Sequence, residues 1–182
     1  MILSTVLRAS SHLVPPGGGD VPLGRWLLRG AAAGAAGTTA LDAATYLDMA
    51  VRGRAPSSTP EQGVEKLAAV LHLAIPGDRE TRQHRVAGLG PLLGAGVGTG
   101  AGVLLGAAHA AGFRPPLPLG SLVTAVGVMV GTNAPMAVLR ISDPRSWSPS
   151  DWLSDALPHA AYGLVTAWTL RELGGRGRPR LR

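Results

Sequence analysis

Residues 88–112 have the sequence GLGPLLGAGVGTGAGVLLGAAHAAG, and the interpretation of this run decides the fold. Glycine-rich runs occur in loops that cradle a phosphate and in helices that pack closely against a neighbour. A phosphate loop requires G-x-x-x-x-G-K-[ST], or G-x-G-x-x-G between a strand and a helix. The single lysine, Lys66, lies outside the run, and no strand pattern precedes the weak match at Gly96, Gly98 and Ala101. The run therefore does not predict a phosphate loop.

The glycines of this run have the spacing of a helix-packing surface. They recur every four residues, at Gly90, Gly94, Gly98, Gly102 and Gly106. At 3.6 residues per turn these positions trace an oblique groove in which a neighbouring helix can seat closely. In water, each interior glycine would cost a helix about 1 kcal/mol. We therefore interpret the five as helix-packing residues, a glycine zipper within a lipid bilayer.

The composition also favours a membrane protein. The chain has 182 residues, of which 46% are hydrophobic, 15% are charged and 4% are aromatic. A soluble domain has about 25% charged residues and needs large side chains to fill its core. A membrane bundle does not, because small residues let its helices approach each other.

Long apolar segments alternate with short polar connections. About 20 helical residues cross the hydrocarbon layer of a membrane. Four segments are longer than that, at about 26–50, 86–112, 117–141 and 149–171. A shorter amphipathic segment, 60–75, lies between the first two and is predicted to be an interfacial helix.

These segments predict an all-α fold, a four-helix transmembrane bundle with one interfacial helix. The membrane domain is expected to cover residues 25–172. Residues 1–24 are expected to be a disordered N-terminal tail, because Pro15 to Gly19 would interrupt any helix. Residues 173–182 are expected to be a basic C-terminal tail.

Charge and cysteine usage limit the function. The net charge is +6, and the arginines lie at the edges of the apolar segments and in the tail, which does not predict nucleic-acid binding. The chain has no cysteine, which excludes disulfides, zinc–thiolate sites and thiol catalysis. We expect no cofactor and no metal.

Polar side chains inside the apolar segments are the candidate ligand or ion site. Such residues are costly in a membrane and often functional. The candidates are Asp42, Thr132, Asn133, Asp155, His159 and Tyr162. Because consecutive spans alternate in direction, the first five fall in the same leaflet. They form either a polar cup for a proton, a cation or a small polar ligand, or a set of structural interhelical hydrogen bonds.

The distribution of Arg and Lys does not decide the orientation. The side of the N-terminus carries nine of them and the other side carries eight. We expect a multi-pass protein of the inner (plasma) membrane with both termini in the cytoplasm.

The run RGAAAGAAGTTALDAATYLDMAVRGRAPSSTPEQ, residues 29–62, resembles the first span of small, uncharacterised four-span integral membrane proteins of high-GC bacteria. The resemblance covers about residues 25–75. It implies an α-helical bundle in the inner membrane, and no activity or functional residue.

Three functions follow as hypotheses. The first is a scaffold or accessory subunit, whose partners are the lipid bilayer and other membrane subunits or further copies of the chain. The second is a small transporter or channel-like protein that uses the polar cup. The third is an intramembrane hydrolase, although the sequence has neither G-x-S-x-G nor H-E-x-x-H. We therefore do not predict an enzyme.

Overall fold

The computed structural model describes residues 21–175, and all regular structure in this range is helical. The elements are α1 (Leu23–Arg52), α2 (Thr59–Val70), α3 (Arg79–Ala110), α4 (Leu117–Val138), the 3₁₀ turn η1 (Pro144–Ser146) and α5 (Pro149–Gly174). The predicted all-α fold is confirmed. The N-terminal tail up to residue 20 and the basic tail from residue 176 lie outside the described residues.

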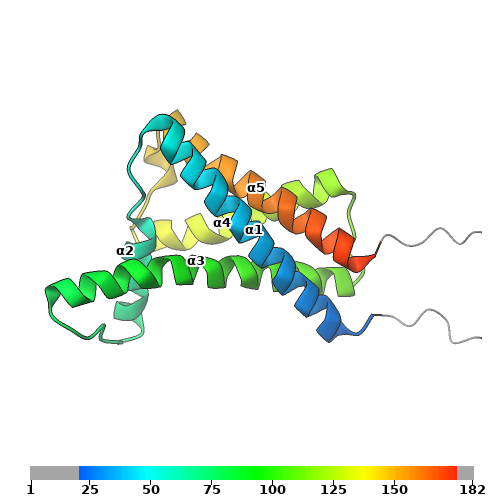
Figure 1. Ribbon diagram of the computed structural model, residues 1–182, viewed down its shortest axis with the longest axis horizontal. Helices are drawn as coiled ribbons and strands as arrows, with labels where there is room; N and C mark the ends of the chain where they lie inside the picture. The colour runs from blue at the N-terminus through cyan, green and yellow to red at the C-terminus, as the bar shows by residue number, and fades with distance from the viewer. Residues whose placement is uncertain (1–20, 176–182) are drawn as a thin grey trace, which may run out of the picture.

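Of the four long helices, α1 lies between α3 and α5, and α4 lies on α5 (Figure 1). α1 packs against α3 on one side and α5 on the other, α4 packs against α5, and α2 packs against α3. Although they follow each other in the chain, α3 and α4 make little contact. The start of α1, the end of α3, the start of α4 and the end of α5 lie together at the right of Figure 1. We call this end of the bundle the tail end.

Two of the helices are long and apolar enough to cross a membrane. These are α3, with 32 residues, and α4, with 22 residues. α1 and α5 have 30 and 26 residues, about 45 and 39 Å at 1.5 Å per residue, but neither combines this length with the same apolar composition. Length and composition thus provide two candidate spans.

Several helix ends differ from the predicted limits. α3 begins seven residues before the expected position, because the Asp78 side chain accepts a hydrogen bond from the Thr81 backbone N–H (2.8 Å) and caps the helix. α2 ends at Val70, before a turn in which His72 has a φ of 54°. α5 begins as expected, in a capping box formed by Ser148 and Asp151.

The crossing of α1 and α3 brings two backbones into contact. A Cβ atom on Gly102 would lie 2.5 Å from Gly34 Cα, and one on Gly106 would lie 3.1 Å from Gly30 Cα. Real Cβ atoms are almost never closer than 3.0 Å to such a neighbour. Only glycine therefore fits at the centre of this crossing, as the small-residue packing of membrane helices requires.

The five glycines of the predicted series have different neighbours. Gly98, Gly102 and Gly106 face α1, whereas Gly90 faces Pro60 of α2. Gly94 is exposed, with no atom within 4 Å of the position of a Cβ. Two crossing helices remain in close contact for only a few turns, so the series cannot contact one neighbour along its whole length.

Candidate functional site

Four of the six predicted site residues form one cluster between α4 and α5. We call it the α4–α5 polar cluster, and it consists of Thr132, Asn133, Asp155 and His159. Asn133 Nδ2 donates to Asp155 Oδ2 (2.8 Å), and Thr132 Oγ1 lies 3.4 Å from His159 Nε2. Each contact joins the last turns of α4 to the first turns of α5. The same two helices also approach closely at Gly163, where a Cβ atom would lie 2.6 Å from the Cβ atom of Ala125.

Both ring nitrogens of His159 face oxygen acceptors. Nδ1 lies 2.7 Å from the Asp155 carbonyl oxygen and 3.4 Å from the Asp155 carboxylate. The Thr132 hydroxyl donates to the carbonyl oxygens of Val128 (3.0 Å) and Met129 (3.2 Å), so its lone pairs face Nε2. A neutral imidazole has one N–H and an imidazolium has two. The ring is therefore held between α4 and its own helix by contacts at both nitrogens.

The cluster is only partly closed. The side chains of His159 and Asp155 are 11% and 21% exposed. Thr132 also lines the groove between α3 and α4 that is described below. The polar groups therefore bond to each other and still border the surface of the bundle.

Asp42 does not join the cluster. Its side chain is exposed, and no hydrogen bond or ion pair connects it to the residues that the structure describes. Asp42 follows Gly37, which is buried on α1, by five residues, a rotation of about 140° around the helix axis. Thr38, one turn before Asp42, faces Gly98 of α3, whereas Asp42 faces outward.

Tyr162 lies one turn beyond His159 but has a different partner. The residue is fully buried, and its hydroxyl donates to the Gly98 carbonyl oxygen of α3 (2.6 Å). Its ring also lies against Gly37 of α1. Tyr162 therefore links α5 to the crossing of α1 and α3.

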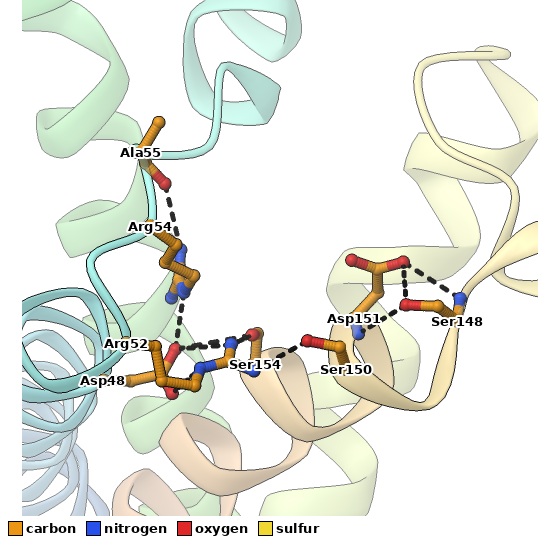
Figure 2. A network of polar contacts seen from close by, with 8 residues as sticks. All are labelled: Asp48, Arg52, Arg54, Ala55, Ser148, Ser150, Asp151 and Ser154. Carbon is orange, nitrogen blue, oxygen red and sulfur yellow. Dashed lines mark hydrogen bonds and ion pairs between the residues drawn. The ribbon is translucent and has the colours of Figure 1, made fainter.

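A second polar cluster joins the end of α1 to the start of α5 (Figure 2). We call it the Arg52 network, and it is centred on Asp48. Arg52 Nε lies 2.7 Å from Asp48 Oδ1, and Arg54 Nε lies 2.5 Å from Oδ2. Arg52 also donates to the hydroxyls of Ser150 (2.7 Å) and Ser154. Two guanidinium groups thus share one carboxylate, and the bonds to α5 fix the corner between the helices.

The sequence analysis did not identify the Arg52 network as a unit. The sequence does contain a pattern that indicates polar helix ends here, because Asp48–Arg52 and Ser150–Ser154 are both i,i+4 pairs on helices. Which of these two helix ends faces the other depends on the packing of α1 against α5, which helix periodicity does not specify.

The chain offers no metal site in the described range. Residues 21–175 contain no group of three or more His, Asp or Glu side chains placed to hold a metal ion. His109 lies away from the α4–α5 polar cluster, at the tail end, with its ring 5.8 Å from that of Trp26. Neither a protein-family model, nor a curated protein, nor a solved structure matches this chain.

Proposed function

We propose that the chain is a multi-pass membrane protein in which α1, α3, α4 and α5 all cross the bilayer. The observation that carries this proposal is the inverted distribution of side chains. On α5, His159, Tyr162 and Thr166 are buried, whereas Leu164 and Trp168 are half exposed. Lipid favours apolar side chains outside a bundle and paired polar groups inside it.

The other helices also expose many large apolar side chains, among them Leu28, Leu104 and Leu122. Among the described residues, the buried apolar set is small and consists of Trp26, Ala33, Val64, Val86, Tyr162, Ala167 and Leu170. On α2, Leu67 and Val70 are exposed, which suits a helix lying on the membrane surface. The resemblance of residues 29–62 to small inner-membrane proteins favours the same location.

Labelling of single cysteines tests the number of spans. The chain has no cysteine of its own, so each label reports one position. Phe113→Cys lies between α3 and α4, and Ser57→Cys lies between α1 and α2. With four spans, Phe113→Cys is labelled from the side of the termini and Ser57→Cys from the opposite side. If only α3 and α4 cross, the two positions exchange sides relative to the termini, and the proposal fails.

We further propose that the protein acts as a scaffold or accessory subunit that receives a membrane-spanning helix of another subunit. The receiving surface is a groove of about 550 Å³ between α3 and α4, which we call the α3–α4 groove. Gly100, Gly127 and Gly131 line it, and no atom lies within 4 Å of where their Cβ atoms would be. Thr124 also lines it, and its buried hydroxyl oxygen has no hydrogen-bond partner in the described chain.

The shape of the groove favours a helix as its occupant. Its lining residues recur with helical spacing from Val97 to Ala108 on α3 and from Val123 to Thr132 on α4. At 1.5 Å per residue these walls run for about 16 and 14 Å, or roughly three helical turns. Small residues along both walls permit the close approach that membrane helices use.

Cross-linking in native membranes tests this assignment. We expect Gly127→Cys, within the groove, to give a cross-link to a protein, and Val130→Cys, on the exposed side of α4, to give none. The double variant Gly127→Leu/Gly131→Leu should abolish assembly and keep the melting temperature, because both positions have free space. Equal cross-linking at positions 127 and 130 would contradict the scaffold proposal.

The α4–α5 polar cluster supports a second candidate function, the passage of a proton or a small cation. The supporting observation is that His159 has acceptors at both ring nitrogens, beside a carboxylate that is partly exposed. An Asp–His pair within a span is a common proton relay.

Flux in reconstituted vesicles distinguishes the two functions. A transporter predicts that His159→Gln stops proton or cation flux while the protein still folds, and that Asp42→Asn has no effect, because Asp42 lies outside the cluster. Unchanged flux in His159→Gln excludes the transport role and leaves the scaffold proposal intact.

A further inference from the structure

A cavity at the tail end combines positive charge with an apolar floor. Its volume is about 270 Å³, and it lies where α1 and α4 begin and α3 and α5 end. His109, Arg114 and Arg171 contribute the charged and titratable side chains of its wall, and no lining residue is acidic. The apolar part of the wall includes Leu117 and Leu170, so the cavity is amphipathic.

The guanidinium groups have free donors. Arg114 uses Nε to bond the His109 carbonyl oxygen (3.2 Å), which leaves its two terminal nitrogens available. Arg171 is exposed and has no hydrogen bond or ion pair with another described residue. His109 Nδ1 lies 3.0 Å from the Leu105 carbonyl oxygen, so His109 is held against its own helix. The free donors are therefore the guanidinium groups of the α3–α4 connection and of α5, which border one cavity without an acceptor among the described residues.

Further positive charge surrounds the same place. Trp26 is 4% exposed. Two guanidinium groups lie over its ring, and their Cζ atoms are 5.0 Å (Arg114) and 5.1 Å (Arg29) from the ring centroid. One terminal nitrogen of Arg29 is buried without a partner among the described residues. α1 and α4 begin here and α3 and α5 end here, so the dipoles of the four helices oppose one another and the positive charge of the cavity comes from its side chains.

We propose that this cavity binds the phosphate headgroup of an anionic lipid. Arg114 and Arg171 contact the phosphate oxygens, and the acyl chain follows the apolar wall of Leu117 and Leu170. Guanidinium groups form strong, charge-assisted hydrogen bonds with phosphate. The inference rests on the proposed membrane location, because the ends of spanning helices lie at the depth of the lipid headgroups. A free phosphate has the same oxygens, but it would leave the apolar wall uncovered.

Native mass spectrometry of the full chain, with equimolar phosphatidylglycerol and phosphatidylcholine, tests the proposal. We expect the unchanged protein to retain phosphatidylglycerol selectively. Arg114→Gln/Arg171→Gln should weaken that binding by about tenfold or more, as expected for the loss of one or more charge-assisted bonds. The matched control is Arg79→Gln/Arg140→Gln, which removes two exposed guanidinium groups at the opposite end of the bundle and should leave binding unchanged. Melting temperatures verify that both variants fold.

Each outcome decides the inference. If both double variants lose lipid equally, the net charge of the protein explains the binding, and the assignment of the lipid to this cavity is overturned. Displacement of the lipid by millimolar inorganic phosphate would assign the site to free phosphate and overturn the lipid source. A topology with only two spans, from the cysteine labelling, would refute the membrane arrangement independently of any lipid result. Loss of selectivity in Arg114→Gln/Arg171→Gln alone, with four spans, would support both proposals.

Discussion

The two glycine-bearing faces of α3 have similar composition and opposite surroundings. Gly102 and Gly106 face the α1 backbone so closely that no Cβ atom fits. Gly96 and Gly100, on the other side of the helix, have no atom within 4 Å of that position. The comparison shows that glycine spacing marks surfaces suited to close packing and does not tell which of them the chain uses internally. The unused face borders the α3–α4 groove, where we place a partner helix.

The largest effect that tests this comparison is expected at the crossing of α1 and α3. In Gly102→Leu, the new side chain meets Gly34 Cα and the Gly30 carbonyl oxygen, so the two backbones must separate. Overpacking a well-packed site costs about 1–3 kcal/mol of unfolding free energy. For Gly102→Leu we expect a loss of about 3 kcal/mol or more. Thermal unfolding in detergent micelles measures it. Gly100→Leu, half a turn away, is the control, and an equal loss in both variants would remove the distinction between the faces.

A smaller loss of unfolding free energy is expected for a substitution in the α4–α5 polar cluster. Asn133→Leu leaves Asp155 Oδ2 without its donor, and we expect a loss of about 1–2 kcal/mol. Adding Asp155→Leu should restore part of it, because the carboxylate no longer needs a partner. A double-mutant cycle of unfolding free energies measures the coupling. Additive losses would show that the hydrogen bond contributes nothing to the packing of these helices.

Two alanine substitutions, two residues apart on α3, are expected to change the unfolding free energy in opposite directions. Gly100→Ala meets open space and should stabilise the helix by about 0.5–1 kcal/mol. Gly102→Ala should destabilise the protein, because its methyl group falls within 2.5 Å of Gly34 Cα. The same melting assay reports both, and a gain in both variants would refute the backbone contact.

The smallest effect concerns the polar start of α3, before its apolar stretch. Hydrogen bonds from Thr81, chiefly from its backbone N–H, lower the pKa of Asp78 below its usual value of 3.8. A lowered folded-state pKa means that this stabilisation is present above pH 3.8 and is lost as the pH falls through the folded-state value. We therefore expect the first turn of α3 to fray in acid, with faster amide exchange at Thr81. Asp78→Asn keeps an acceptor without the charge, and it should show no such pH dependence.

The sequence predicted much of the candidate site and missed part of its geometry. Because α4 and α5 run in opposite directions, the positions of Asn133 and Asp155 in the chain were enough to predict that they lie at the same level of the bundle, and the structure shows that they also form a hydrogen bond. Asp42 satisfied the same reasoning about the level along the bundle but lies on another side of α1. Depth follows from chain direction alone, whereas the rotation of a helix around its axis depends on its neighbours.

The sequence by itself determined the helical segments, the start of α5 at its capping box and the surfaces bare enough for close packing. These features depend on local chemistry, which is readable within a few residues: capping side chains, glycine spacing and apolar length. Only the tertiary structure decided that α1 takes one glycine face of α3, that the other face remains open, and that Arg52 joins Ser150 across the bundle. Those outcomes depend on which helices cross and where, and helices that share so many small residues can cross in several ways.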